Sequence, residues 1–455
     1  MFNKLKFRLW HFIERFKFGR YLLRCWMRFK EQCWYLKSRL LASKLQSPVL
    51  DNRIDGGFLR LRITNRCNAK CRFCNFWNVL GKAPEADMPQ KWMYDYCTAL
   101  YDKIKCLILT SGETLIARDA FKFFSFISEQ YPAVTIFTES NGIAFTRRWQ
   151  ELAADNLFMM HFSMNAVTEE TYLKGVWQKG ESGGSNAFRM TKQNVTDYCN
   201  LLHERNLDVF RPSLSMVINR DTCAEVQDFI LMALKLKARN IWLFFDFYES
   251  DFNTGHFAVP ELHNTLKTIL KIERLLKDKV FFNFRLYLPL NILDGLQEET
   301  DAMDIDDLSN EFADILAAAG GRSVINEYLE REKIRKERGK KSFSFEEDFA
   351  DTLHESAIAG KVCCPAPWKE LDLQPDGNLK ICGWHTRGIN IKDFIKNDTI
   401  DWEKLLDHPH LRLMRQDVLC GNYDYCMECC PLNSKYKKIQ DPLKYYLEKM
   451  GNINE

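Results

Sequence analysis

The sequence predicts an α/β protein built on a partial or complete parallel (β/α) barrel, with an N-terminal amphipathic helical arm and a small cysteine-rich C-terminal domain. Three observations indicate this architecture. Apolar runs alternate with helical stretches from about residue 57 onward, a CxxxCxxC triplet directly follows the first run, and seven more cysteines lie after residue 361. Repeated strand–helix units form parallel sheets, whose chemistry lies at the carboxyl ends of the strands.

Length and composition favour one large domain plus a smaller one. The chain has 455 residues, 46% of them hydrophobic, which is enough for sizeable cores. Its sixteen unevenly spaced cysteines and the lack of a recognisable signal peptide argue against a secreted disulfide scaffold. Paired thiols of the CxxC type in such a chain indicate metal or redox ligands in a reducing cytosol. Apolar runs of about twenty residues are absent, so a spanning helix is not expected.

Residues 1–50 are predicted to form a basic, aromatic, amphipathic arm. Residues 1–46 carry twelve Lys and Arg against two Glu, whereas the whole chain has a net charge of +3. Such a helix can lie on an anionic membrane surface or dock on a partner protein. It can equally pack on the protein's own barrel. The expected location is the cytoplasm, with peripheral attachment to the inner face of the membrane as an alternative, and no nucleic-acid partner is expected.

The barrel itself is expected within residues 57–296. Its strands are continuous apolar runs, as in strands that are buried on both faces. The candidates in chain order are Phe58–Thr64, Cys106–Thr110, Val134–Thr138, Phe158–Met164, Ser213–Ile218, Ile241–Phe247 and Phe281–Leu288. The helical stretches between them include Trp92–Lys103, Arg118–Gln130, Ala187–Arg205 and Cys223–Leu236.

The alternation stops at residue 297. Residues 297–361 are charged and mostly helical in pattern, and we expect a solvated connector, with a substrate lid as the alternative. The cysteine-rich domain is expected over residues 362–435, and a basic tail over residues 436–455.

The triplet Cys67, Cys71 and Cys74 predicts a metal centre. Three thiolates this close together after a strand can hold a cubane iron–sulfur cluster, whose usual complement is four cysteines. The missing ligand leaves one iron open, and an open position is typical of metal sites that perform chemistry. The alternatives are a chance cluster or a zinc site with a distant fourth ligand, although CxxxCxxC is not a zinc-knuckle spacing.

With the first strand, this triplet and the units that follow, the chain resembles the radical S-adenosylmethionine (SAM) superfamily. Phe73 matches the aromatic residue that the family places before its last cluster cysteine. The second strand ends in Ser111-Gly112-Glu113-Thr114, which is similar to the family's Gly-Gly-Glu-Pro motif, with Ser and Thr in place of Gly and Pro. The resemblance implies that this turn contacts the amino group of the cofactor. A small residue lets carbonyls approach an ammonium, and Glu113 adds opposite charge.

The resemblance also implies polar cofactor contacts at the ends of later strands. Asn141 follows the third strand, and Ser163 and Asn165 lie at the end of the fourth. Ser215 on the fifth strand and Phe245 on the sixth are weaker candidates. Each polar residue taken alone is more often a strand cap or a turn former than a ligand.

The reaction that the resemblance implies is specific. The open iron binds SAM, one electron splits the sulfonium, and the 5′-deoxyadenosyl radical removes a hydrogen atom from the substrate. The electron would come from a donor such as flavodoxin or ferredoxin. The substrate is expected to be a small metabolite or carbohydrate, or a peptide if the enzyme is a SPASM-type peptide (RiPP) or protein maturase. A non-catalytic iron–sulfur redox protein is a remote alternative, and no catalytic acid or base is assigned.

The second cysteine field resembles the SPASM extension of many radical enzymes, which has a cysteine, then GxxxxC, then a distant CxxC. A tight turn at Asp376-Gly377 is expected to carry Cys382 back toward Cys364. The resemblance implies one auxiliary [4Fe-4S] cluster, although four cysteines also suit zinc. The expected ligands are Cys364, Cys382, Cys426 and Cys429, with Cys363, Cys420 and Cys430 as alternates.

Overall fold

The structure is a computed structural model. It describes residues 33, 36–37, 40, 57–74, 87–110, 112–177, 181–245, 259–285, 299–341, 370–382, 388–396 and 399–419. Several predictions therefore lie outside the described residues. These are nearly all of the N-terminal arm, the basic tail, Ser111, and every cysteine of the second field except Cys382.

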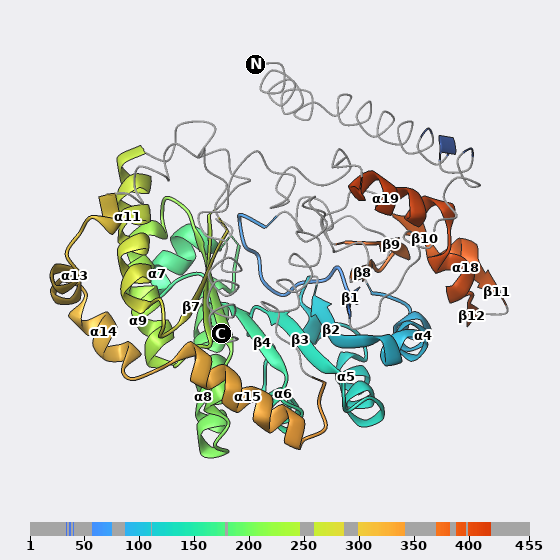
Figure 1. Ribbon diagram of the computed structural model, residues 1–455, viewed down its shortest axis with the longest axis horizontal. Helices are drawn as coiled ribbons and strands as arrows, with labels where there is room; N and C mark the ends of the chain where they lie inside the picture. The colour runs from blue at the N-terminus through green and yellow to red at the C-terminus, as the bar shows by residue number, and fades with distance from the viewer. Residues whose placement is uncertain are drawn as a thin grey trace, which may run out of the picture.

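One ten-stranded sheet organises the described part of the chain, in the order β10-β9-β8-β1-β2-β3-β4-β5-β6-β7. Strands β1 to β7 run parallel to their neighbours, and β8 pairs in parallel with β1. The strands β9 and β10 are antiparallel. Among the described strands, β7 and β10 are the two edges, so the parallel barrel is partial. Helices cover the outside of the curved sheet (Figure 1).

The seven predicted strands are confirmed. They are β1 Gly57–Arg62, β2 Ile104–Thr110, β3 Thr135–Ser140, β4 Met159–Ser163, β5 Ser213–Ile218, β6 Asn240–Phe245 and β7 Phe281–Arg285. Their apolar runs match strands that are covered by helices on one side and face the lumen on the other. The C-terminal part adds β8 Glu370–Leu373, β9 Asn378–Lys380 and β10 Ile389–Asn390, and a separate pair, β11 Ile395–Lys396 and β12 Thr399–Ile400.

The four predicted helical stretches are helical as well. They correspond to α4 Gln90–Leu100 with a 3-10 turn, α5 Ala120–Gln130, α8 Gly184–Glu204, and α9 Val226–Lys235 after another 3-10 turn. The fold also contains α6 Arg147–Asp155, α11 Val259–Leu276, α18 Trp402–Leu406 and α19 Pro409–Leu419. None of the helices in the described ranges is both long and apolar enough to cross a membrane.

Strand β1 separates two environments, because successive side chains of a strand point to opposite faces. Leu59 and Leu61 belong to the main core under the helices. Phe58 belongs to a smaller apolar cluster with residues of β2, β3 and β4. Arg60 and Arg62 alternate with these leucines and therefore share the face of Phe58. The lumen of the partial barrel is thus apolar in one part and charged in another.

The C-terminal hairpin supplies the partners of these two arginines. Arg60 Nε lies 2.9 Å from Glu370 Oε1, and Arg62 Nη2 lies 2.8 Å from Asp372 Oδ2. Burial alone would lower the pKa of Arg60, but Glu370, Asp372 and then Glu139 outweigh burial and raise it. Strand β8 therefore joins the barrel sheet through its backbone and through two ion pairs.

The predicted turn at Asp376-Gly377 is confirmed. Strands β8 and β9 pair antiparallel around it, and Gly377 has φ of +87°, a conformation that favours glycine. Cys382 follows β9 closely. The region expected to form a small separate domain thus continues the barrel sheet through this hairpin.

Residues 299–341 are helical as predicted, and they are partly buried rather than fully solvated. They form α13 Ile305–Glu311, α14 Ala313–Ala319 and α15 Val324–Glu337. The main core includes four of their apolar side chains, which recur at helical spacing: Leu308, Phe312, Ile315 and Ala319. Even Arg335 is 1% exposed, on an α15 that crosses the lower side of the sheet in Figure 1. The frequent charges of this stretch obscured a narrow apolar stripe.

Candidate functional site

The cysteine triplet lies in the loop directly after β1, at the carboxyl end of that strand. Cys67, Cys71 and Cys74 are half-buried, and none of them forms a disulfide within the described residues. The Cys74 amide donates to the Cys71 carbonyl at 3.1 Å, and the Ala69 amide donates to Cys67 Sγ at 3.4 Å. Burial raises the pKa of Cys67 to about 12. The pKa of Cys71 is raised by burial first, and then by the nearby Cys74 and Cys67. The three sulfurs are therefore close enough to influence one another.

An apolar cluster supports this loop from the connection between β4 and α8. That connection contains the short α7 Glu169–Thr171 and the π-helix Tyr172–Val176. Cys71 forms an antiparallel bridge with Trp177, and the Arg72 amide donates to the Val176 carbonyl at 2.9 Å. Phe73 packs against the same cluster, together with Cys67 and Cys71. In this structure Phe73 is thus placed to anchor the cysteine loop.

The turn after β2 presses directly on the cysteine loop. The Gly112 amide donates to the Thr64 carbonyl at 3.2 Å, and the Glu113 amide donates to the Arg66 carbonyl at 2.7 Å. A Cβ atom on Gly112 would lie 2.1 Å from the Arg66 carbonyl oxygen, so only glycine permits this contact. Thr114 is fully buried, and its hydroxyl makes no hydrogen bond within the described residues.

The carboxylate of Glu113 connects this turn to the end of β3. It accepts hydrogen bonds from the Leu115 amide at 3.2 Å, the Ser140 hydroxyl at 3.0 Å and the Asn141 amide at 2.7 Å. Glu113 is 1% exposed, and burial raises its pKa to about 7 although these hydrogen bonds act in the opposite direction. The residue predicted as an ammonium partner is therefore also the connection between two turns.

Asn141 is the predicted cofactor residue whose side chain reaches the cysteine loop. Its Nδ2 atom donates to Asn68 Oδ1 at 2.8 Å and approaches Cys67 Sγ at 3.6 Å. Its Oδ1 atom accepts from the Ile143 amide at 2.9 Å. The structure thus brings together the triplet, the Gly112–Thr114 turn and Asn141.

The remaining predicted cofactor residues connect β4 and β5. Asn165 has φ of +60°, and its Oδ1 accepts from the Val217 amide at 3.0 Å. The Ser215 hydroxyl lies 2.9 Å from His161 Nε2, and its carbonyl accepts from the Asn165 amide at 3.1 Å. Ser163 is half-buried at the end of β4. The side chains of Asn165 and Ser215 are therefore engaged within the sheet, as turn former and strand contact.

Neither the π-helix nor the loop after β5 had a recognisable signal in the sequence. Both segments pack beside the cysteine loop through Arg72, Asp221 and the apolar cluster containing Tyr172 and Trp177. Burial and the nearby Cys71 and Cys67 raise the pKa of Tyr172. Residue spacing could not reveal these neighbours, because they lie about 100 to 150 positions from the triplet, as in the contacts of Arg72 with Lys174 and Asp221.

The donor set suits a cluster better than a single ion. Within the described ranges, no three Cys, His, Asp or Glu side chains are arranged to hold one metal ion. An iron–sulfur cubane makes a different demand, because each thiolate binds a different iron atom and the ligands stand further apart. Three half-buried cysteines in one loop would each be available to bind a different iron of such a cluster.

Comparison with known proteins agrees with the resemblance. Residues 61–233 match the model of the Radical SAM superfamily. A curated relative, GTP 3′,8-cyclase of Staphylococcus carnosus, is 25% identical over 138 residues, which are 29% of this chain and 38% of that protein. GTP 3′,8-cyclase of Campylobacter curvus is 24% identical over 115 residues, which are 25% of this chain and 36% of that protein. The matches therefore span little more than a third of these relatives.

A solved structure shares the fold at low sequence identity. Streptococcus suis SuiB bound to precursor peptide SuiA matches with a TM-score of 0.50 and 11% identity, covering 89% of this chain and 79% of that chain. Residues 61–233 thus match the Radical SAM superfamily domain, and the matches indicate an enzyme.

Proposed function

We propose that this protein holds a [4Fe-4S] cluster through Cys67, Cys71 and Cys74 and uses it with SAM to remove a hydrogen atom from a substrate. The observation that carries the proposal is the contact between the cysteine loop and the Gly112–Glu113 turn, which requires glycine at position 112. When bound, the cluster and SAM would supply the one-electron cleavage that generates the 5′-deoxyadenosyl radical.

The chain's own residues would prepare the site for these groups. Cys67, Cys71 and Cys74 must lose their protons to bind iron. The side-chain amide of Asn141, whose Nδ2 atom approaches Cys67 Sγ at 3.6 Å, would favour the thiolate form of Cys67. Glu113 would face the ammonium group of SAM across the turn, and a nearby positive charge would lower the pKa that burial raises. The apolar cluster behind the loop would exclude water.

We propose a polar substrate, either a small molecule or a peptide. The charged part of the barrel lumen, formed by Arg60 with Glu370 and Arg62 with Asp372, favours polar groups over an apolar ligand. The relatives named GTP 3′,8-cyclase support a small molecule. The precursor peptide bound to SuiB supports a peptide, as in the peptide maturases.

Anaerobic incubation with SAM and a strong reductant tests the proposal. We expect the reconstituted protein to form 5′-deoxyadenosine, measured by chromatography. Cys71→Ala is expected to form no more than the protein-free background, because the cluster loses one of its three ligands. Cys223→Ala, which removes another half-buried free cysteine, is the matched control and should keep wild-type activity. Absence of 5′-deoxyadenosine from the wild type, or its persistence in Cys71→Ala, would contradict the proposal.

We also propose the auxiliary cluster, with Cys382 as one ligand and Cys364, Cys426 and Cys429 as the others. The β8–β9 hairpin supports this, because it sets Cys382 directly after a strand of the barrel sheet. Two cubanes require about eight irons per chain, and one requires about four. We expect iron analysis to find about eight in the wild type and about four in Cys382→Ala, with Cys223→Ala unchanged. About four irons in the wild type would exclude the auxiliary cubane.

Flavodoxin or ferredoxin is the proposed class of electron donor, because a SAM-binding cubane needs one electron per cleavage. Residues 1–46 are proposed to contact a membrane surface or a partner protein from the cytoplasm, on the strength of their basic and aromatic composition.

A further inference from the structure

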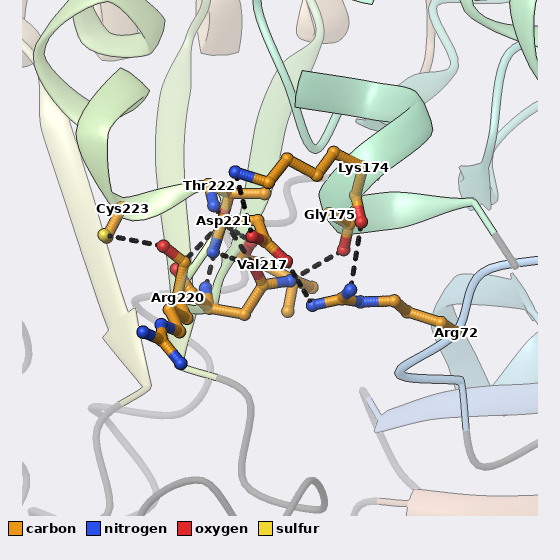
Figure 2. A network of polar contacts seen from close by, with 9 residues as sticks. Arg72, Lys174, Gly175, Val217, Arg220, Asp221, Thr222 and Cys223 are labelled. Carbon is orange, nitrogen blue, oxygen red and sulfur yellow. Dashed lines mark hydrogen bonds and ion pairs between the residues drawn. The ribbon is translucent and has the colours of Figure 1, made fainter. Parts of the chain in front are cut away.

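Arg72 joins the cysteine loop to two other segments of the molecule, as Figure 2 shows. It lies between Cys71 and Cys74 in the sequence. Its Nη1 atom donates to the Lys174 carbonyl at 2.9 Å, and its Nη2 atom lies 2.9 Å from Asp221 Oδ2. The second oxygen of Asp221 lies 3.4 Å from Lys174 Nζ. One guanidinium therefore contacts both the π-helix after β4 and the loop after β5.

The two segments that receive Arg72 are locked to each other. Asn219 Nδ2 donates to the Gly175 carbonyl at 2.8 Å, and Asn219 Oδ1 accepts from the amides of Asp221 and Thr222 at 2.9 and 3.1 Å. The Thr222 hydroxyl donates to the Val217 carbonyl at 2.9 Å. A Cβ atom on Gly175 would lie 2.8 Å from Thr222 Cγ2, so the close approach needs glycine. Asp221 is thus presented on a loop whose shape is set independently of Arg72.

The two ion pairs of Asp221, with Arg72 and with Lys174, differ in how deeply their side chains are buried. The side chains of Arg72 and Asp221 are 26% and 19% exposed, whereas that of Lys174 is 69% exposed. Exposed ion pairs contribute little because water screens them, while partly buried pairs with fixed geometry contribute more. The Arg72–Asp221 contact is therefore the one that can hold the cysteine loop in place.

We propose that Asp221 is a positioning residue for the cysteine loop, which it holds through Arg72 in the shape needed to receive iron. A metal site is most effective when contacts behind its ligands orient them before the metal binds. The consequence for catalysis rests on the proposed function, but the contact itself does not. Through this contact, the loop after β5 would also keep the three cysteines in a fixed arrangement. Both loops lie at the same edge of the sheet.

Thiol labelling of the iron-free, full-length protein tests this. Iodoacetamide modification of each cysteine is followed by mass spectrometry, with Cys97 and Cys199, which are 2% and 1% exposed, as internal reporters of an intact core. We expect both Asp221→Asn and Arg72→Gln to speed labelling of Cys71 and Cys74 by about tenfold, because each frees the loop. Lys174→Gln should change the rate less than twofold, as should Glu151→Gln, which removes an exposed ion pair elsewhere.

The two central variants separate positioning from a simple charge effect. Asp221→Asn leaves the Arg72 charge uncompensated near the thiols, whereas Arg72→Gln removes that charge. A purely electrostatic influence on the thiolates would therefore shift the two labelling rates in opposite directions, and this result would overturn the proposal. Unchanged rates would overturn it as well, and so would equal acceleration of Cys97 and Cys199, which would show general unfolding.

The readout also distinguishes this proposal from the proposed function, because it needs neither iron nor SAM. Labelling that changes as expected in a protein that forms no 5′-deoxyadenosine would keep the positioning role and remove the reaction. Normal SAM cleavage together with unchanged labelling in Asp221→Asn would keep the proposed reaction and remove the positioning role of Asp221. Slower iron uptake by Asp221→Asn and Arg72→Gln, compared with Glu151→Gln, is the expected companion result.

Discussion

Gly112→Ala is expected to lower the free energy of unfolding by about 2–3 kcal/mol and to reduce SAM cleavage at least about 100-fold. The added Cβ would lie 2.1 Å from the Arg66 carbonyl oxygen and 2.8 Å from its carbonyl carbon. Both are backbone atoms, so no side-chain rotation can relieve the overlap. The turn after β2 and the cysteine loop must separate, which breaks the hydrogen bond from Glu113 to Arg66.

Denaturant unfolding and 5′-deoxyadenosine formation measure these two effects. Gly321→Ala is the matched control, because a Cβ at that position would meet nothing within 4 Å. Its stability and activity should stay close to wild type. If Gly112→Ala behaved like Gly321→Ala, the close contact between the turn and the cysteine loop would be refuted.

Glu113→Gln is expected to remove a pH dependence from the stability of the protein. Burial raises the Glu113 pKa from 4.5 to about 7, so the folded state holds this proton more tightly than the unfolded state. The contribution of Glu113 to stability is therefore greatest below about pH 4.5, falls as the pH rises to about 7, and is constant above. Over this window the wild type should lose about 3 kcal/mol that Glu113→Gln does not lose.

Melting temperatures between pH 5 and pH 8 test this expectation, with wild type and variant measured side by side. The advantage of the wild type over Glu113→Gln should shrink as the pH rises. The exposed Glu151→Gln variant should run parallel to the wild type. At pH 8, Glu113→Gln should also cleave SAM about tenfold more slowly. The backbone amides of Leu115 and Asn141 donate to different oxygens of Glu113, and a glutamine side chain has only one oxygen to accept from them. Parallel pH curves for wild type and Glu113→Gln would argue against a raised pKa.

Local patterns predicted the barrel strands well, and one charged segment poorly. Buried strands are rich in apolar side chains, so β1 to β7 were visible in the sequence, although β1 alternates its leucines with Arg60 and Arg62. The burial of the segment with α13 and α14 was not predicted, because charged residues are frequent around the four apolar residues that meet the core. Which side chains a helix buries depends on the elements that pack against it, and the composition of the helix does not reveal those elements.

The candidate site also combines features that the sequence predicted with features that only the fold revealed. The triplet and the Ser111–Thr114 motif indicated where a cluster and its cofactor would lie, since both follow strands that end at one edge of the sheet. The role of Gly112 in approaching Arg66, and that of Glu113 in joining two turns, became visible only with the fold. Ser215 and Asn165, which were predicted as cofactor residues, have side chains engaged between β4 and β5.

From local patterns alone, seven strands in order and a cysteine loop after the first could be predicted, together with residue types that suit iron. These features are local, because strand burial and ligand spacing are written within a few residues. The pairing of β8 with β1, with Arg62 beside Asp372, and the contact of Asp221 with Arg72 became visible only in the folded chain. The two contacts join residues that are 310 and about 150 positions apart. Such pairs form only when the chain folds, so no local pattern of the sequence reveals them.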